Sequence, residues 1–206
     1  MSRYDINGLQ NTAQPGTDGR ILANKLGITR REDIDEVELV LLKKLYFSVL
    51  HEHLPSGHIT VRLIKAWHRR WLGNIYTWAG LERSVNMSKD GFPFAAADRV
   101  PVLLHDYERR YLLPYTPCTA YSRDALIEAI AISHVEFILI HPFREGNGRI
   151  ARLLADVMAT QAGYGPLDYS SWSAQRTRYI QAIQAGLGED YGMMQGWVDR
   201  ALAATP

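Results

Sequence analysis

The spacing of apolar residues predicts a chain built almost entirely from helices. Apolar positions recur every three or four residues across residues 29–54, which predicts a long first helix. Thr29 followed by Glu32 has the form of a capping box at its start. Thr60 is placed to cap a second helix that ends near Gly73. Further helices are expected over approximately 98–113, 124–140, 148–162, 175–185 and 190–203.

Two stretches depart from a simple amphipathic helix. Residues 124–140 are apolar on nearly every side, which is typical of a central, buried helix. Between Arg83 and Phe94 the period changes to two, and Asp90-Gly91 is a hairpin-turn dipeptide. The first 28 residues form a mostly polar arm. The pattern therefore predicts an all-α bundle that carries one small β-hairpin.

Composition narrows the class of protein. A chain of 206 residues with 47% hydrophobic and 22% charged residues fits a single folded domain. A net charge of +1 argues against a dedicated nucleic-acid binder. The single cysteine, Cys118, excludes an intramolecular disulfide and an all-cysteine metal site. The sequence contains no apolar run of about 18 residues, so no membrane span is predicted. No signal-peptide pattern is visible, so a cytoplasmic location is expected.

One segment, residues 141–152, concentrates groups suited to nucleotide chemistry. Pro142, Gly146 and Gly148 interrupt a continuous helix, so a loop should lead into a helix N-terminus, where backbone N–H groups favour an anion. Arg149 and Arg152 oppose the dipole of such a helix unless a polyphosphate lies there. Arg152 could instead pair with Asp156, four residues further on.

Two other side chains in the same segment complete this chemistry. Glu145 offers an oxygen ligand of the kind that Mg²⁺ takes beside nucleotide phosphates. His141 is the nearby side chain that can take up a proton close to neutral pH.

This segment resembles the signature H-x-F-x-(D/E)-G-N-G-R-x-x-R of the Fic (Fic/Doc) family. The eight defined positions are matched by His141, Phe143, Glu145, Gly146, Asn147, Gly148, Arg149 and Arg152. Similarity extends to Pro15-Gly-Thr-Asp, Asn24-Lys-Leu-Gly, Ile75-Tyr-Thr-Trp-Ala-Gly, Asn86-Met-Ser-Lys-Asp-Gly-Phe and Tyr179-Ile-Gln-Ala-Ile. The resemblance implies a Fic-type helical bundle, with an N-terminal arm over residues 1–28 and a Fic domain over 29–206, its core roughly 60–186.

The resemblance also implies an activity, the ATP-dependent transfer of AMP to a Tyr, Ser or Thr hydroxyl of a target protein. His141 would be the general base, and Glu145 would bind Mg²⁺. Gly146, Asn147, Gly148 and Arg149 would surround the α- and β-phosphates, Arg152 would hold the γ-phosphate, and Tyr179 would lie near the adenine or ribose. The hairpin flap, Ser84 to Phe94, would pair with an extended segment of the target.

Regulation is expected to come from outside the chain or to work differently from that of many relatives. Many family members carry an inhibitory helix with the pattern (S/T)-x-x-x-E-(G/N), whose Glu neutralises the second arginine of the signature. The approximate match here runs from Ser48 to Glu52, but His53 follows in place of Gly or Asn. A small antitoxin-type inhibitor acting in trans is therefore a possible partner, and secretion into another cell stays open.

Other readings of the same residues remain open. A Doc-like protein kinase, another transfer of a phosphate-linked group on the same fold, or a catalytically silent protein-binding module would each fit the resemblance. His134 is interpreted as a core or supporting residue. The run from Trp67 to Trp71 resembles a basic-aromatic nucleic-acid segment, but its apolar spacing favours a packed helix.

Overall fold

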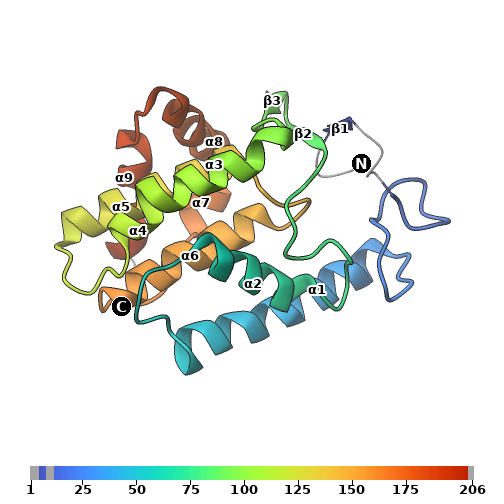
Figure 1. Ribbon diagram of the computed structural model, residues 1–206, viewed down its shortest axis with the longest axis horizontal. Coiled ribbons are helices and arrows are strands. Elements are labelled where there is room, and N and C mark those ends of the chain that lie inside the picture. Colours follow the sequence, from blue (N-terminus) through green and yellow to red (C-terminus); the bar gives the residue numbers. More distant parts are fainter. Residues whose placement is uncertain (1–4, 8–11, 204–206) are drawn as a thin grey trace.

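The computed structural model describes residues 5–7 and 12–203, and most of them lie in helices (Figure 1). The first half of the chain holds α1 (Arg31–Phe47), continued by a π-helical segment (Ser48–Glu52), α2 (Val61–Leu72), α3 (Val100–Tyr107) and α4 (Leu113–Tyr115). The second half holds α5 (Arg123–Ile140), α6 (Asn147–Gln161), α7 (Ser170–Ala174), α8 (Arg176–Ala185) and α9 (Gly192–Ala203). This architecture confirms the expected helical bundle.

The helix termini confirm one of the two capping predictions and contradict the other. Thr60 does cap α2, because its Oγ1 accepts a hydrogen bond from the Leu63 N–H at 3.2 Å. The capping box at Thr29 is wrong: Arg30 occupies the N-cap of α1 in an extended conformation, and no side chain caps the helix. The expected third helix is broken into a 3₁₀ turn (Ala97–Arg99), α3, a π-helical segment (Glu108–Leu112) and α4.

A small sheet stands at one end of the bundle. Strands β2 (Asn86–Lys89) and β3 (Phe92–Pro93) form the expected hairpin, and both Asp90 (φ 52°) and Gly91 (φ 79°) have the positive φ of a primed turn. The polar arm was not expected to contribute a strand, yet β1 (Asp5–Asn7) pairs antiparallel with β2, giving the order β1-β2-β3. The register places Ile6 opposite Met87.

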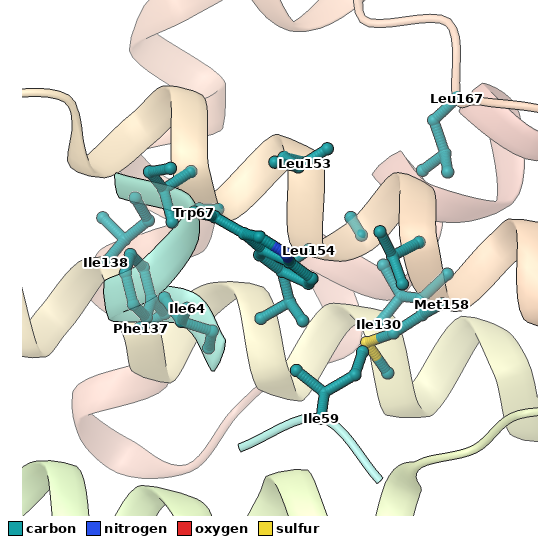
Figure 2. Close-up of a cluster of buried hydrophobic side chains, with 14 of the residues drawn as sticks. Ile59, Ile64, Trp67, Ile130, Phe137, Ile138, Leu153, Leu154, Met158 and Leu167 are labelled. Atoms are coloured by element: carbon teal, nitrogen blue, oxygen red, sulfur yellow. The ribbon is translucent and has the colours of Figure 1, made fainter. Parts of the chain in front are cut away.

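Helix α5 lies at the centre of the bundle, as its uniformly apolar sequence predicted, and packs against α3, α6, α8 and α9. Figure 2 shows the core that α5 shares with α2 and α6, formed by Ile64 and Trp67 of α2, Ile130, Phe137 and Ile138 of α5, and Leu153, Leu154 and Met158 of α6. The residues that join α5 to α6 are consequently buried. Within the described residues, every helix is too short or too polar to cross a membrane.

Candidate active site

The turn between α5 and α6 places a histidine in an unusual backbone conformation. Helix α5 ends at His141, whose φ of 51° and ψ of 58° lie in the left-handed region that non-glycine residues seldom adopt. The N–H of His141 still donates to the Phe137 carbonyl at 3.0 Å. Such a conformation persists only where surrounding contacts hold it, and it is common at functional sites.

The imidazole of His141 is buried and oriented for accepting a proton. Its Nδ1 lies 3.1 Å from the Ile138 carbonyl, which can only accept, so Nδ1 carries the hydrogen and Nε2 is the basic atom. The ring of Phe94, from the hairpin, stacks on it at 3.6 Å. Burial, with smaller contributions from Arg83 and Lys89, lowers the pKa of His141 to about 3, so the ring is neutral at neutral pH.

Asn147 shapes the connecting turn through its side chain. Its Oδ1 accepts from the Phe143 N–H at 2.8 Å, and its Nδ2 donates to the Phe143 carbonyl at 2.7 Å. The side chain is fully buried. Because both ends of the amide are committed to the turn, the group that Asn147 can offer to an anion is its backbone N–H at the start of α6.

His68 of α2 supports the same turn and was not singled out by the sequence. Its ring stacks on Phe143 at 3.9 Å, its Nε2 donates to the Glu145 carbonyl at 3.0 Å, and its Nδ1 accepts from the Gly80 N–H at 2.8 Å. Burial lowers the pKa of His68 to about 4. The packed-helix interpretation of Trp67–Trp71 is confirmed, since both tryptophans are buried. The sequence offered one signal for His68, which is its position between two tryptophans on the apolar face of the helix.

Gly146 is required both for its conformation and for its lack of a side chain. Its φ is 84°, and a Cβ there would lie 2.6 Å from Cζ3 of Trp71. Glu145, beside it, is nearly buried, and its Oε1 accepts from the Gly146 N–H at 2.9 Å. The described residues contain no cluster of three ligating side chains that could hold a metal by itself.

The two signature arginines, Arg149 and Arg152, differ in whether a carboxylate pairs with the guanidinium. Arg149 donates to Glu38 of α1 at 2.7 Å, lies 3.4 Å from Glu145, and stacks over Trp71 at 4.3 Å. Arg152 lies over the Tyr169 ring at 5.0 Å and forms no ion pair within the described residues. The alternative partner Asp156 accepts instead from the Tyr169 hydroxyl at 2.8 Å and from the Leu167 N–H at 2.9 Å.

Tyr179 of α8 is held by His134 of α5. Its hydroxyl lies 2.8 Å from His134 Nε2, and its ring stacks on Trp172 at 5.2 Å. Burial raises the pKa of Tyr179 to about 12 and lowers that of His134 to about 3, so both are neutral. These contacts fit the interpretation of His134 as a supporting residue.

A cavity of about 150 Å³ brings three of the expected site residues together. His141, Gly148 and Tyr179 line it with residues of the hairpin and of α8. At its rim, Asp90 of the hairpin turn pairs with Arg176 of α8 at 2.9 Å. Glu145 lines a different and smaller cavity of about 30 Å³, together with Glu38 and Tyr76.

The amino-acid sequence was compared with protein families and with known proteins, and it matches one family. The model of the Fic/DOC family matches residues 58–159. A probable protein adenylyltransferase of Sinorhizobium fredii, y4lH, is 29% identical over 192 residues, covering 91% of this chain and 93% of the relative. The protein adenylyltransferase Fic of Nematostella vectensis is 34% identical over 176 residues, covering 80% of this chain but only 38% of the relative.

The fold is shared with solved structures. The Bartonella tribocorum protein BepC, whose crystal structure holds AMPPNP, superposes with a TM-score of 0.74 at 22% identity, covering 93% of this chain and 96% of that one. The helical bundle of this chain therefore has a known fold.

Proposed function

This chain belongs to the Fic/DOC family, and from that premise we propose that it transfers AMP from ATP to a hydroxyl group of a target protein. The observation that carries the proposal is the turn at His141. A buried, neutral imidazole with Nε2 as its basic atom lies at the end of α5, and a short turn, residues 142–146, leads from it to the N-terminus of α6. A proton acceptor and an anion-binding helix end are the two features that such a transfer needs.

The nucleotide would be held mainly by charge and by backbone N–H groups. The N–H groups of Asn147 and Gly148 begin α6, where the helix itself cannot satisfy them. Arg152, which lacks a carboxylate partner in the described residues, is available for a terminal phosphate. Arg149 is already paired with Glu38, so its contribution to the phosphates is that of a partly compensated charge.

The residues present fit Mg²⁺ on the condition that ATP and water supply the other ligands. Glu145 supplies a single carboxylate, and Mg²⁺ is typically held by one or two carboxylates with phosphates and water completing the shell. Glu145 would therefore hold the ion together with ATP. The ion would neutralise phosphate charge during the transfer.

The proposed chemical step uses these residues as follows. His141 Nε2 takes the proton of the target hydroxyl, and the oxygen of that hydroxyl bonds to the α-phosphorus of ATP. The bond from that phosphorus to the bridging oxygen of the β-phosphate breaks, and pyrophosphate leaves. Positioning and charge neutralisation would supply most of the barrier reduction.

The target would dock on the hairpin, residues 84–94, by strand addition. The β3 edge is short and contains Pro93, which lacks an N–H, so it offers little for pairing. The β2 edge is the better one, and the chain's own β1 pairs there. A target segment would then replace β1.

Replacing a residue of β1 tests this docking mode. Proline cannot continue the ladder, so Ile6→Pro should release β1 and raise the rate of target labelling several-fold. Thr12→Pro, five residues beyond the end of β1, is the control. Unchanged labelling in Ile6→Pro would exclude β2 as the docking edge.

We also propose that no glutamate of the π-helical segment restrains the site. Glu52 is half-exposed and lies 3.7 Å from His53, while Ser48 accepts from Arg70 at 2.9 Å. Glu52→Gly should therefore leave the transfer rate nearly unchanged, and an inhibitor acting in trans would need to bring its own carboxylate to Arg152. A tenfold rise in this variant would identify Glu52 as an internal brake.

Radiolabelled ATP tests the activity itself. The purified chain is incubated in a cell lysate with α-³²P-ATP and, separately, with γ-³²P-ATP. Protein labelled only by the first supports AMP transfer. Protein labelled by the second indicates phosphorylation, and no labelling with either indicates a silent binding module.

A further inference from the structure

A single buried guanidinium connects the hairpin to the end of α5. Arg83 is only 3% exposed. Its Nε donates to the His141 carbonyl at 2.7 Å, its Nη1 donates to Val85 at 2.7 Å, and its Nη2 donates to Ile140 at 3.2 Å and also to the Ala95 carbonyl. The Arg83 N–H donates to the Pro142 carbonyl at 2.8 Å.

The acceptors of Arg83 are backbone carbonyls of two kinds. Ile140 and His141 lie at the C-terminal end of α5, where carbonyls lack helical partners and the dipole is negative. Val85 precedes β2 and Ala95 follows β3, so these two carbonyls mark the two ends of the hairpin. Arg83 forms no ion pair within the described residues, so its charge is balanced by carbonyl dipoles alone.

The same point of attachment controls the imidazole. The left-handed backbone of His141 needs contacts to hold it, and Arg83 bonds directly to its carbonyl. Phe94, next to Ala95, stacks on the imidazole, and the Ala95 N–H donates to the Leu139 carbonyl at 3.2 Å. Arg83 therefore anchors both the hairpin and the imidazole of His141.

We propose that Arg83 is a positioning residue that fixes the hairpin and His141 relative to each other. A target segment on the hairpin and the base that receives its proton would then be held in one register. Loss of Arg83 would leave the start of α6, and with it nucleotide binding, in place. The inference rests on the proposed function where it concerns transfer, but the geometry it describes can be measured without any transfer.

The test compares Arg83→Met, which removes every side-chain donor, with Arg83→Lys, which keeps the charge but cannot reach all four carbonyls. Arg99→Met and Arg99→Lys, made at an exposed arginine shortly after the hairpin, are matched controls. Arg83→Met should lower kcat for transfer about 100-fold, the size expected from misplacing a reacting group by about 1 Å. ATP affinity measured by calorimetry should change less than about twofold, and Arg83→Lys should recover part of kcat.

Hydrogen exchange supplies a readout that does not depend on activity. The Phe94 N–H, which donates to the Met87 carbonyl at 3.1 Å, should exchange at least tenfold faster in Arg83→Met. The Ile150 N–H, which donates to Gly146 at 3.0 Å in α6, should be unaffected. Unchanged exchange at Phe94, or an equal loss of ATP affinity and kcat, would overturn the proposal. If the wild-type chain transfers nothing, the proposed function fails, and exchange at Phe94 still decides the role of Arg83.

Discussion

The two sides of His141 are built in different ways. On one side, residues 142–152, here the cradle half, rest on α1 and α2 through buried contacts of His68, Trp71 and Glu38. On the other side, residues 84–95, here the flap half, form a short hairpin tied down by Arg83, by the Phe94 ring and by the exposed Asp90–Arg176 pair. The cradle half belongs to the core, and the flap half is attached to it at a few points.

This difference matches what each half would bind under the proposed function. A nucleotide presents the same charged groups at every turnover, and preorganised groups in the protein bind it with a smaller cost for ordering. A protein segment that adds as a strand needs an accessible edge and some freedom of approach. Substitutions in the cradle half should therefore affect stability and nucleotide binding together, whereas those in the flap half should affect chiefly the target.

The largest effect is expected at the junction of the two halves. Under the proposed function, His141→Ala should lower the transfer rate about 10²–10⁴-fold, because it would remove the general base. ATP affinity should stay near the wild-type value, because the base acts on the target hydroxyl. Single-turnover labelling and calorimetry measure the two quantities. A variant that labels at the wild-type rate would remove His141 from this role.

A pair of glycine substitutions compares the halves directly. Gly146 and Gly91 have similar positive φ values of 84° and 79°, but an added Cβ meets Trp71 at 2.6 Å in the first case and nothing within 4 Å in the second. Gly146→Ala should cost about 2–4 kcal/mol of unfolding free energy, and Gly91→Ala about 1 kcal/mol. Urea denaturation measures both. Equal losses would show that the cradle half is as adaptable as the flap half.

The buried histidines should contribute a pH dependence to the stability. His68 has a folded-state pKa of about 4, against 6.5 when unfolded, so the unfolded chain binds more protons between these values. The free energy of unfolding therefore falls as the pH is lowered from 7 towards 4, by about 2 kcal/mol from His68 alone between pH 7 and pH 5. His134 and His141 act in the same direction.

Urea denaturation at pH 7 and pH 5 checks this expectation. His68→Gln lowers stability at both values but should reduce the difference between them by about 2 kcal/mol. His51→Gln, at an exposed histidine, is the control. A difference that stays the same in His68→Gln would contradict the assignment.

The smallest effect is expected at the rim of the flap half. The Asp90–Arg176 pair is exposed on both sides, so Asp90→Asn should change the unfolding free energy by less than about 0.5 kcal/mol. A double-mutant cycle with Arg176→Gln measures the coupling. A coupling above about 1 kcal/mol would show that the flap half is fixed more firmly than its exposure indicates.

Local patterns determined most of the secondary structure. The period of 3.6 in α2 and α6, the apolar α5 and the Asp90-Gly91 turn are each set by residues close together in the sequence, and the structure agrees with them. The wrong capping box at Thr29 shows the limit of a short motif, because the chain enters α1 one residue later than the motif requires. The roles of the signature residues themselves stay predictions that the variants above can test.

The sequence alone determined which residues we predict to carry the chemistry, because the signature lies within twelve consecutive positions. Only the tertiary structure decided what holds them in place. Arg83 is 58 residues from His141, His68 is 77 residues from Glu145, and Glu38 is 111 residues from Arg149. Each of these partners is a charged or polar side chain whose local pattern is that of an ordinary surface or helix residue. Burial beside a distant group, a backbone carbonyl for Arg83 and His68 and the Arg149 guanidinium for Glu38, gives each one its role, and that burial exists only once the bundle has closed.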